Sequence, residues 1–381
     1  MMSFLLLLLC GCSDPEPAAV KKEKPGKICG VWISYIELDK MVQSGNLNDT
    51  FKAYAEKFRD FGITDVFLHV VPFCDAAYNS KIYHSRYGTD ILKTAVEICH
   101  KAGLKLHAWI NPYRVKTSNG SIDNLSKDSI AYRWLFDDKA ENDDNICFYN
   151  DGIYLNPAKS EVKQTVLEVV RELCRNYDID GIHIDDYFYP TTDSAFDNKT
   201  YADYTKETEN PLSLTDFRIC NVNSLVSSIY TAIKFIDKDL VFSVSPAADI
   251  DKNKNTFFAD IAAWCEGSCV DMIIPQLYFG FCYKNEDFCF ENIISRWKNL
   301  AGNSNTKLVI GLAAYKTGAE TAADGDEWIT RDDILSRETE ICLKDKAVFG
   351  VVFYSCSSLF SDMELNTASR EKIKTVLKGK I

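Results

Sequence analysis

The residues best suited to chemistry lie in the segment Asp180–Pro190, which reads DGIHIDDYFYP. Ile182 and Ile184 alternate with polar side chains, so one face of a short strand is apolar and the other is polar. Asp185 and Asp186 follow at the carboxyl end of this strand, among aromatic and imidazole rings. Two acids in such surroundings suit acid–base catalysis; the simpler alternative is that they cap a loop.

Cleavage of a glycosidic bond needs one protonated carboxyl group and a second, ionised group. Asp185 shares the polar face of the strand, and we assign it the ionised role of nucleophile, base or acetamido stabiliser. Asp186 and Glu37 are the candidates for the acid. Adjacent strand residues point apart, which counts against Asp186, and Glu37 has the parity of the apolar residues before it. Spacing alone leaves this choice open.

Strand-like and helix-like runs alternate eight times after residue 28, which predicts an α/β fold: a (β/α)8 TIM barrel in a single domain. An open doubly wound sheet is the alternative, but no glycine-rich phosphate loop follows the first strand. The predicted strands are Cys29–Tyr35, Asp65–Val71, Lys105–Asn111, Gly181–Tyr187, Val241–Ala247, Met272–Tyr278, Lys307–Ala314 and Gly350–Ser355. The expected helix caps are Gly62, Gly103 and Gly302 at C-termini and Asp90, Ser160 and Thr330 at N-termini.

Side chains at the carboxyl ends of barrel strands gather at one mouth, where barrel enzymes bind substrate. Amide, guanidinium and hydroxyl groups bind sugar hydroxyls, and flat rings cover the apolar faces of pyranoses. The long connections Pro112–Ala158 and Phe188–Arg218, after strands three and four, should wall the cleft. Trp109 could equally fill a core layer. The predicted substrate-binding residues are Asp75, Tyr78, His107, Trp109, Asn111, Tyr113, Arg114, His183, Tyr187, Gln276 and Tyr278.

The histidines His69, His107 and His183 fall on neighbouring strands at inward parity, which raises the question of a metal site. They lack the paired spacing of barrel metal sites, so we expect no metal and no other cofactor. We expect them to be hydrogen-bonded neighbours of the site. Cys265 and Cys269 have no second pair to complete a zinc site.

The formal net charge of −12 and the absence of a basic patch argue against nucleic acid as a partner. At the N-terminus, the apolar run Phe4–Leu9 leads into Leu9-Cys10-Gly11-Cys12, which resembles a bacterial lipoprotein signal box. We therefore expect a signal segment (1–12), lipidation at Cys12, a flexible tether (13–28) and the barrel (29–381). This places the protein outside the cytoplasm in a bacterial cell envelope, lipid-anchored to a membrane.

Several long segments resemble the glycosyl-hydrolase-like family of the family-10-like group. They are Gly30–Ser34, Asp75–Tyr78, His107–Arg114, Leu155–Pro157, Asp180–Pro190 and Pro275–Tyr278. The resemblance covers essentially all of the chain after the tether. It implies a (β/α)8 barrel that hydrolyses glycosidic bonds. One family member from an enveloped bacterium is associated with peptidoglycan glycan strands stripped of their peptides.

A weaker resemblance connects Asp180–Asp185 and Gln276–Tyr278 with strands four and six of family 18 chitinases. Chitinases use the substrate's own N-acetyl group and a glutamate two residues beyond the last aspartate; Tyr187 stands there in this chain. We therefore expect a surface-anchored glycoside hydrolase acting on a bacterial or host polysaccharide or oligosaccharide, possibly N-acetylated. A non-catalytic glycan-binding lipoprotein and a metal-dependent deacetylase or amidohydrolase are the alternatives.

Overall fold

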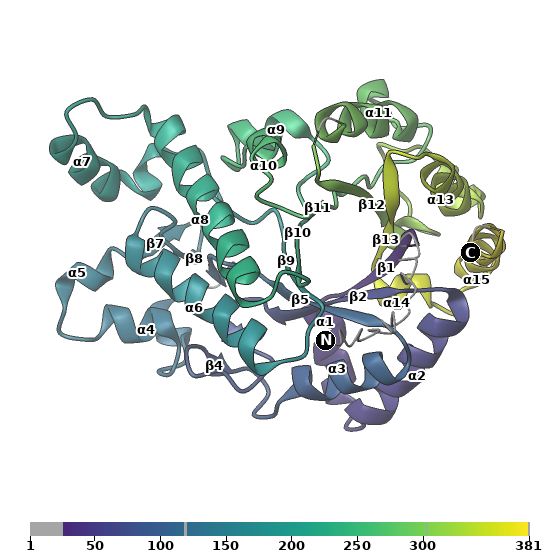
Figure 1. The fold of residues 1–381 in the computed structure, drawn as a ribbon, viewed down its shortest axis with the longest axis horizontal. Coiled ribbons are helices and arrows are strands. Elements are labelled where there is room, and N and C mark those ends of the chain that lie inside the picture. Colours follow the sequence, from purple (N-terminus) through teal and green to yellow (C-terminus); the bar gives the residue numbers. More distant parts are fainter. Residues whose placement is uncertain (1–25, 118–119, 303, 380–381) are drawn as a thin grey trace, which may run out of the picture.

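Eight parallel strands close into a barrel in the computed structural model, which describes residues 26–117, 120–302 and 304–379. Helices surround the barrel (Figure 1). The predicted (β/α)8 fold is therefore confirmed. In chain order the barrel strands are β1 (Ile28–Ile33), β2 (Asp65–Val71), β5 (Lys105–Ile110), β9 (Gly181–Ile184), β10 (Val241–Val244), β11 (Met272–Ile273), β12 (Lys307–Ala313) and β13 (Val348–Tyr354).

Most of the outer helices bury an apolar face against the strands or against a neighbouring helix. The longer ones are α2 (Leu47–Phe61), α3 (Ile91–Lys101), α6 (Ser160–Asn176), α8 (Leu214–Ile236), α11 (Phe290–Ala301), α13 (Ile334–Lys344) and α15 (Glu364–Lys378). The shorter ones are α1 (Tyr35–Gln43), α4 (Ile130–Leu135), α5 (Ala140–Asp143), α7 (Asn198–Glu207), α9 (Ile250–Asn255), α10 (Ile261–Glu266), α12 (Glu327–Thr330) and α14 (Cys356–Leu359). Although α8 is apolar and long enough for a membrane span, it packs on α6 and α10.

The helix ends follow most of the predicted capping signals. Asp90 accepts a hydrogen bond from the backbone N–H of Lys93, and Gly62 ends α2 in the left-handed region at φ 104°. Gly103 and Gly302 also lie at helix ends. Two predicted N-caps are wrong by one to three residues. Lys159 precedes α6, whose first residue is Ser160, and Asp333 precedes α13, whereas Thr330 ends α12.

Alternation along the strands separates two apolar clusters. Outward side chains such as Val31 and Ile184 join the core beneath the helices, whereas Trp32, Phe67 and Trp109 meet inside the barrel. Predicted strands four to six run too far at their carboxyl ends. The regular ladder ends at Ile184, Val244 and Ile273, and beyond it Gln276 forms isolated parallel bridges with Ala247 and Gly311.

The two long connections lie where the sequence predicts them, but they contain secondary structure that it did not. The first holds an antiparallel sheet of β6 (Arg114–Lys116), β7 (Ile146–Tyr149) and β8 (Gly152–Leu155). Asn150 and Asp151 join β7 to β8 with φ of 46° and 57°, as a two-residue hairpin turn requires. The second holds α7, which stands away from the barrel beside this sheet (Figure 1). Together they enlarge one side of the mouth.

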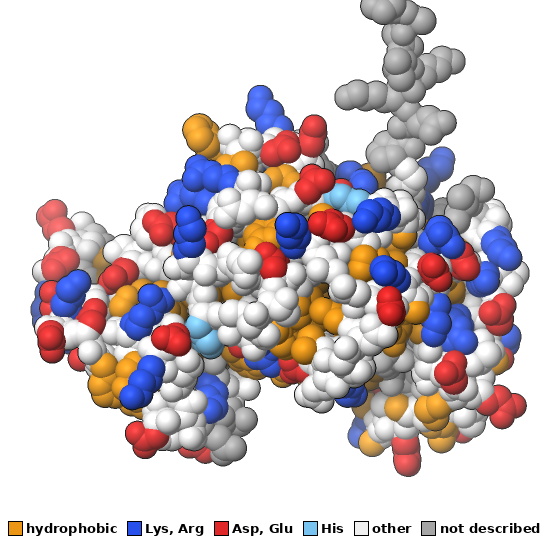
Figure 2. All heavy atoms as spheres, turned by 90° about the horizontal axis from the view of Figure 1, so that it is seen from below, with side chains coloured by type: hydrophobic (Ala, Val, Ile, Leu, Met, Phe, Trp, Pro, Cys, Tyr) orange, Lys and Arg blue, Asp and Glu red, His pale blue; other side chains and the backbone are white. Residues whose placement is uncertain are grey.

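Acidic and basic side chains are interspersed over the face shown in Figure 2, with no extended region of one sign. The basic side chains on this face do not gather into a continuous stripe.

A buried acid on α13 gives a prediction about stability. Glu338 is fully buried, and its carboxyl oxygens have no hydrogen-bond partner among the described residues. Burial, and then the charge of Glu327, raises the pKa of Glu338 well above its ordinary value. Above about pH 4.3 the unfolded chain releases this proton while the folded protein keeps it, so stability falls as pH rises.

Glu338→Gln removes this ionisation. At pH 4 we expect the variant to unfold near the wild-type temperature. At pH 8 its free energy of unfolding should exceed that of the wild type by at least about 1.4 kcal/mol, the equivalent of one pKa unit. Thermal and urea unfolding at both pH values measure the difference. Identical pH dependence of the two proteins would contradict the prediction.

Candidate active site

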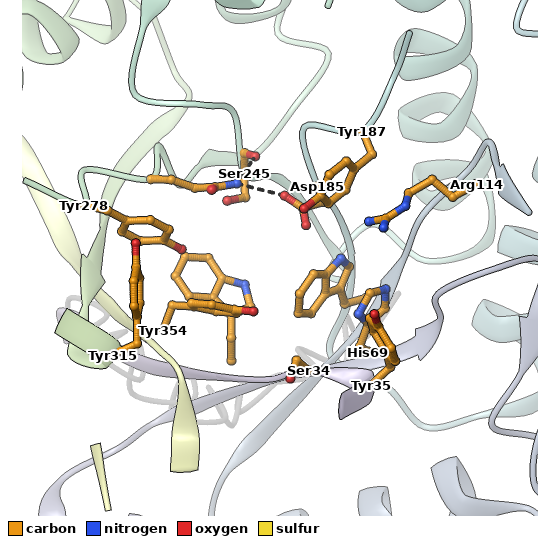
Figure 3. A pocket seen from close by; sticks show the side chains of 13 residues that line it. Ser34, Tyr35, His69, Arg114, Asp185, Tyr187, Ser245, Tyr278, Tyr315 and Tyr354 are labelled. Carbon is orange, nitrogen blue, oxygen red and sulfur yellow. Dashed lines mark hydrogen bonds between the residues drawn. The ribbon is translucent and has the colours of Figure 1, made fainter. Parts of the chain in front are cut away.

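A cavity of about 320 Å³ opens at the carboxyl end of the barrel. Figure 3 shows the side chains that surround it, with polar and aromatic groups converging on an open centre. We call it the central pocket. Its lining residues are Trp32, Ser34, Tyr35, His69, Trp109, Arg114, Asp185, Tyr187, Ser245, Gln276, Tyr278, Tyr315 and Tyr354.

Asp185 contributes the only carboxyl group among these lining residues. Its Oδ1 accepts hydrogen bonds from the backbone N–H of Asp186 at 2.8 Å and from the side-chain amide of Gln276 at 2.9 Å. The other oxygen points into the pocket in Figure 3. A proton on that oxygen would face a bound ligand.

The surroundings of Asp185 favour its protonated form. Burial, and then the negative charge of Asp186, raises the pKa of Asp185 well above its ordinary value, while the charge of Arg114 acts in the opposite direction. The sequence led us to expect the ionised role for Asp185, because parity says nothing about desolvation. A carboxyl group kept neutral near pH 7 is suited to donate a proton.

Asp186 does not line the central pocket, but its carboxyl group interacts with that of Asp185 and with the side chain of Gln276. It lines a neighbouring cavity of about 250 Å³ with Tyr154 and Phe257. Arg114 and Tyr187 border both cavities. These two side chains thus form a partition between the cavities, while the carboxyl groups of Asp185 and Asp186 interact with each other.

That partition is built from a cation and a ring. The guanidinium carbon of Arg114 lies 4.0 Å from the centre of the Tyr187 ring, which is 46% exposed. The described residues offer Arg114 no ion pair. The charge of Asp185, and then burial, raises the pKa of Tyr187, so its hydroxyl stays protonated. Both groups are available as hydrogen-bond donors to a ligand.

Tyrosines form the wall opposite Arg114. The rings of Tyr278 and Tyr354 are stacked with centres 5.9 Å apart, and Tyr315 meets both edge-on. Burial, more than the nearby acids Glu37 and Asp185, raises the pKa of Tyr354 to about 12. Flat rings with protonated hydroxyls can cover the apolar face of a sugar and bind its hydroxyl groups.

The floor is held by a hydrogen-bonded chain through His183. The indole N–H of Trp32 donates to Nε2 of His183 at 3.0 Å, so the proton of this imidazole is on Nδ1, which donates to Ser243 Oγ at 2.8 Å. Burial lowers the pKa of His183 well below its ordinary value. Gly311 leaves room for Trp32, because a Cβ there would lie 2.9 Å from the indole ring. His183 thus positions Trp32, and both of its nitrogens are already engaged.

His69 differs from the hydrogen-bonded histidine that the sequence suggested. Its ring is stacked on Trp109 with centres 3.7 Å apart, and neither nitrogen has a hydrogen-bond partner among the described residues. Burial, and then the charge of Arg114, lowers its pKa well below the ordinary value. A neutral, stacked imidazole therefore lines the pocket.

Glu37 lies outside the central pocket. It is buried in the first turn of α1, where one oxygen accepts from the backbone N–H and hydroxyl of Ser34, and the other from Ser355 Oγ and the N–H of Ser357. This capping arrangement engages both oxygens and joins the start of α1 to the end of β13. It explains Glu37 as a structural residue and leaves no oxygen directed at a substrate.

Besides His183, which lies beneath Trp32, five predicted substrate-binding residues lie outside the central pocket. Asp75 lines a separate cavity and pairs with Arg86 at 2.7 Å. His107 lies one layer below Trp109, with Nε2 2.9 Å from Asp65. Tyr78 and Tyr113 are buried in the core beneath the helices, and Asn111 accepts a hydrogen bond from the Trp109 indole. Strand parity predicts which residues face the barrel interior. It does not predict how deep they lie along the barrel axis or which way the chain turns after each strand.

The described residues contain no group of three or more His, Cys, Asp or Glu side chains placed to hold a metal ion.

The sequence predicted six lining residues of the central pocket: Trp109, Arg114, Asp185, Tyr187, Gln276 and Tyr278. Three others, Trp32, His69 and Tyr354, lie at inward parity near the ends of β1, β2 and β13. The sequence already placed His69 at inward parity, and the alternation rule applied to the first and last strands would have found Trp32 and Tyr354. Tyr35 and Tyr315 follow their strands, where alternation no longer holds.

Comparison with known proteins agrees with this geometry. The family model for glycosyl hydrolase-like 10 matches residues 27–330. The glycosyl hydrolase YngK of Bacillus subtilis (strain 168) is 27% identical over 378 residues, which cover 90% of this chain and 72% of that protein. The glycosyl hydrolase DigH of Escherichia coli (strain K12) is 27% identical over 429 residues, which cover 99% of this chain and 95% of that protein.

Solved structures share the fold. The glycoside hydrolase domain of PgaB (BpsB) from Bordetella bronchiseptica superposes with a TM-score of 0.58 at 11% identity, covering 92% of this chain and 99% of that one. α-L-Fucosidase isoenzyme 2 from Paenibacillus thiaminolyticus superposes with a TM-score of 0.54 at 13% identity, covering 87% of this chain and 47% of that one. The chain therefore belongs to the glycosyl hydrolase-like 10 family and is a glycoside hydrolase built on a (β/α)8 barrel.

Proposed function

We propose that the protein cleaves a glycan containing N-acetylated sugars, of the kind found in peptidoglycan strands, with Asp185 as the proton donor. The observation that carries this proposal is the single carboxyl group of the central pocket. It is desolvated, held through one oxygen by Gln276, and directs its other oxygen into the cavity. Aromatic rings on two sides suit a pyranose bound above it.

In the first step the pocket-facing oxygen of Asp185 gives its proton to the glycosidic oxygen. The bond from that oxygen to C1 breaks, and the leaving sugar departs as an alcohol. Because no second carboxyl group lines the central pocket, the substrate's own 2-acetamido oxygen attacks C1. Water then attacks C1, its proton returns to Asp185, and the acetamido group is restored. This mechanism forms the product with its original anomeric configuration.

Arg114 and Tyr187 supply the polar contacts that this mechanism needs. Arg114 has no ion pair with a described residue and forms, with Tyr187, the partition between the two cavities. Its donors suit an acetamido carbonyl or the carboxylate of an acidic amino sugar.

Cleavage of matched glycans tests the proposal. The purified protein is incubated with N-acetylated oligosaccharides, their de-N-acetylated forms, peptide-free peptidoglycan strands and neutral glucans. We expect the N-acetylated substrates to be cleaved, with kcat/KM at least about 100-fold above the deacetylated forms, because an intramolecular nucleophile has a high effective concentration. NMR should show retained configuration. Inversion, or equal cleavage of both forms, would contradict acetamido assistance, and binding without cleavage of any glycan would favour the binding-protein alternative.

We further propose that Cys12 anchors the enzyme to a membrane of the bacterial envelope. Support comes from the Leu9–Cys12 signal box, which lies outside the described residues. A lipid anchor together with the tether would hold the barrel at a surface where polymeric glycans occur.

Fractionation of cells expressing Cys12→Ala tests the anchor. We expect the wild type in the membrane fraction and the variant among the soluble extracytoplasmic proteins or retained unprocessed. Labelling with an alkyne fatty acid should mark the wild type alone. Equal labelling and equal membrane content of the two proteins would rule out Cys12 as the lipidation site.

A further inference from the structure

A second cavity lies directly beside the central pocket, on the side of β11 and β12. Its volume is about 520 Å³, within the range of small-molecule sites. Gln276, Tyr278 and Tyr315 line both cavities. The shared side chains place the two spaces next to each other. We call the second cavity the outer pocket.

Aromatic rings give the outer pocket flat walls. Phe279 and Tyr283 meet edge to face with ring centres 4.6 Å apart. Tyr315 meets Tyr278 in the same way at 5.7 Å, and 42% of Tyr315 is exposed. Rings that present a face to an open cavity are suited to the apolar side of a pyranose.

A buried ion pair holds these rings in place. Lys316 Nζ lies 2.7 Å from Asp324 Oδ2, and both side chains are buried. The same ammonium group lies 5.7 Å from the centre of the Phe279 ring and 5.9 Å from that of Tyr283. Such contacts between a desolvated cation and ring faces fix the rings against the base of the pocket.

Hydrogen bonds fasten the loop after β11 to the loop after β12. Glu327 accepts from the backbone N–H groups of Phe281 and Cys282 at 3.1 Å each, and Asp324 accepts from that of Gly280 at 3.3 Å. A Cβ at Gly280 would lie 1.8 Å from the Glu327 carboxylate, so this close approach requires glycine. The walls are formed before a ligand arrives, which lowers the ordering cost of binding.

We propose that the outer pocket is a second sugar subsite, which binds the pyranose next to the one held over Asp185. The inference rests on the proposed function and adds that the enzyme acts on chains, with affinity drawn from a unit beyond the scissile bond. Tyr283 and Phe279 provide its stacking surface, and Lys316 with Asp324 positions them.

The test compares kcat/KM for N-acetylated oligosaccharides from the shortest one cleaved up to six units. The wild type should gain activity as the added unit reaches the outer pocket. For the longer substrates, Tyr283→Ala should lower kcat/KM by about 10-fold or more, as expected for removal of a ring from a binding pocket. For the shortest substrate cleaved, kcat/KM should change less than about 2-fold. Lys284→Ala is the matched control, because this exposed residue of the same loop does not line the pocket.

Gly280→Ala provides a second route to the same result, since it separates the two loops without removing a ring. We expect it to lose the same length-dependent gain, with an unfolding temperature close to that of Tyr283→Ala. Equal losses on every chain length, or no loss on any, would overturn the subsite while leaving the proposed function intact. Failure of the wild type to cleave any glycan would overturn both.

Discussion

Asp185→Asn is expected to reduce kcat for glycan cleavage by about 10²- to 10⁴-fold, the usual contribution of a positioned general acid. The substitution keeps the size of the side chain, and its amide oxygen can still accept the hydrogen bonds from Gln276 and the backbone N–H of Asp186. It cannot deliver a proton to the leaving oxygen. Substrate binding should change little, so the loss should appear in kcat and not in KM.

The pH dependence of wild-type activity distinguishes a proton donor from an ionised base or nucleophile at Asp185. A general acid works while it is protonated, so activity should be present at low pH and fall as pH rises through the pKa of Asp185. Burial and the charge of Asp186 raise that pKa, so the fall should occur well above the ordinary range of an aspartate. Activity that instead falls toward low pH, with a midpoint near pH 4, would show that Asp185 acts as an ionised base or nucleophile.

Asp186→Asn is the matched control for Asp185→Asn. The Asp186 side chain lines the neighbouring cavity and is not the proposed proton donor. Replacing it removes a negative charge near Asp185, which should lower the pKa of Asp185. We expect less than about a 10-fold decrease in kcat, and the fall in activity moved to lower pH. A loss as large as that of Asp185→Asn would make Asp186 an equal partner in the chemistry.

Asp197→Ala is expected to destabilise the fold by about 3–5 kcal/mol, the cost of leaving one member of a buried ion pair alone. Arg218 and Asp197 are both fully buried, with Arg218 Nε at 3.2 Å and 3.1 Å from the two carboxylate oxygens. The same guanidinium donates to the backbone oxygens of Thr191 and Asp193. The pair therefore fastens the segment after Asp185–Tyr187 to α8.

Urea unfolding of single and double variants measures this effect. Replacing the pair together, as Asp197→Leu with Arg218→Met, should restore much of the lost stability, because no buried charge remains. Asp60→Ala, in the exposed pair with Arg59, should change stability by less than about 1 kcal/mol. A cost for Asp197→Ala no greater than that of Asp60→Ala would show that the buried pair contributes little.

The sequence predicted the barrel well because its signals are local and repeated. The alternation in residues 181–185 and the regular succession of strands and helices survive in the structure almost unchanged. Asp185, Gln276 and Tyr278 were found because each lies at inward parity beyond a short buried strand. Such signals depend only on the strand period and on the rule that barrel sites lie at the carboxyl ends.

The remaining site residues depend on long-range packing that spacing does not contain. Glu37 resembles a rim acid in the sequence, yet hydrogen bonds from Ser355 and Ser357, more than 300 positions away, engage it in the fold. The ionisation of Asp185 depends on desolvation, which no local pattern reports. Tyr315 reaches the central pocket from a loop whose course is set by the buried pair Lys316–Asp324.

The most direct test of the central claim is a crystal structure of the Asp185→Asn variant soaked with an N-acetylated oligosaccharide. We predict a sugar ring between Tyr278 and Arg114, with the glycosidic oxygen within hydrogen-bond distance of the residue 185 side chain and the acetamido oxygen near C1. An oligosaccharide bound elsewhere, or one whose glycosidic oxygen lies beyond the reach of residue 185, would contradict the assignment of Asp185 as proton donor.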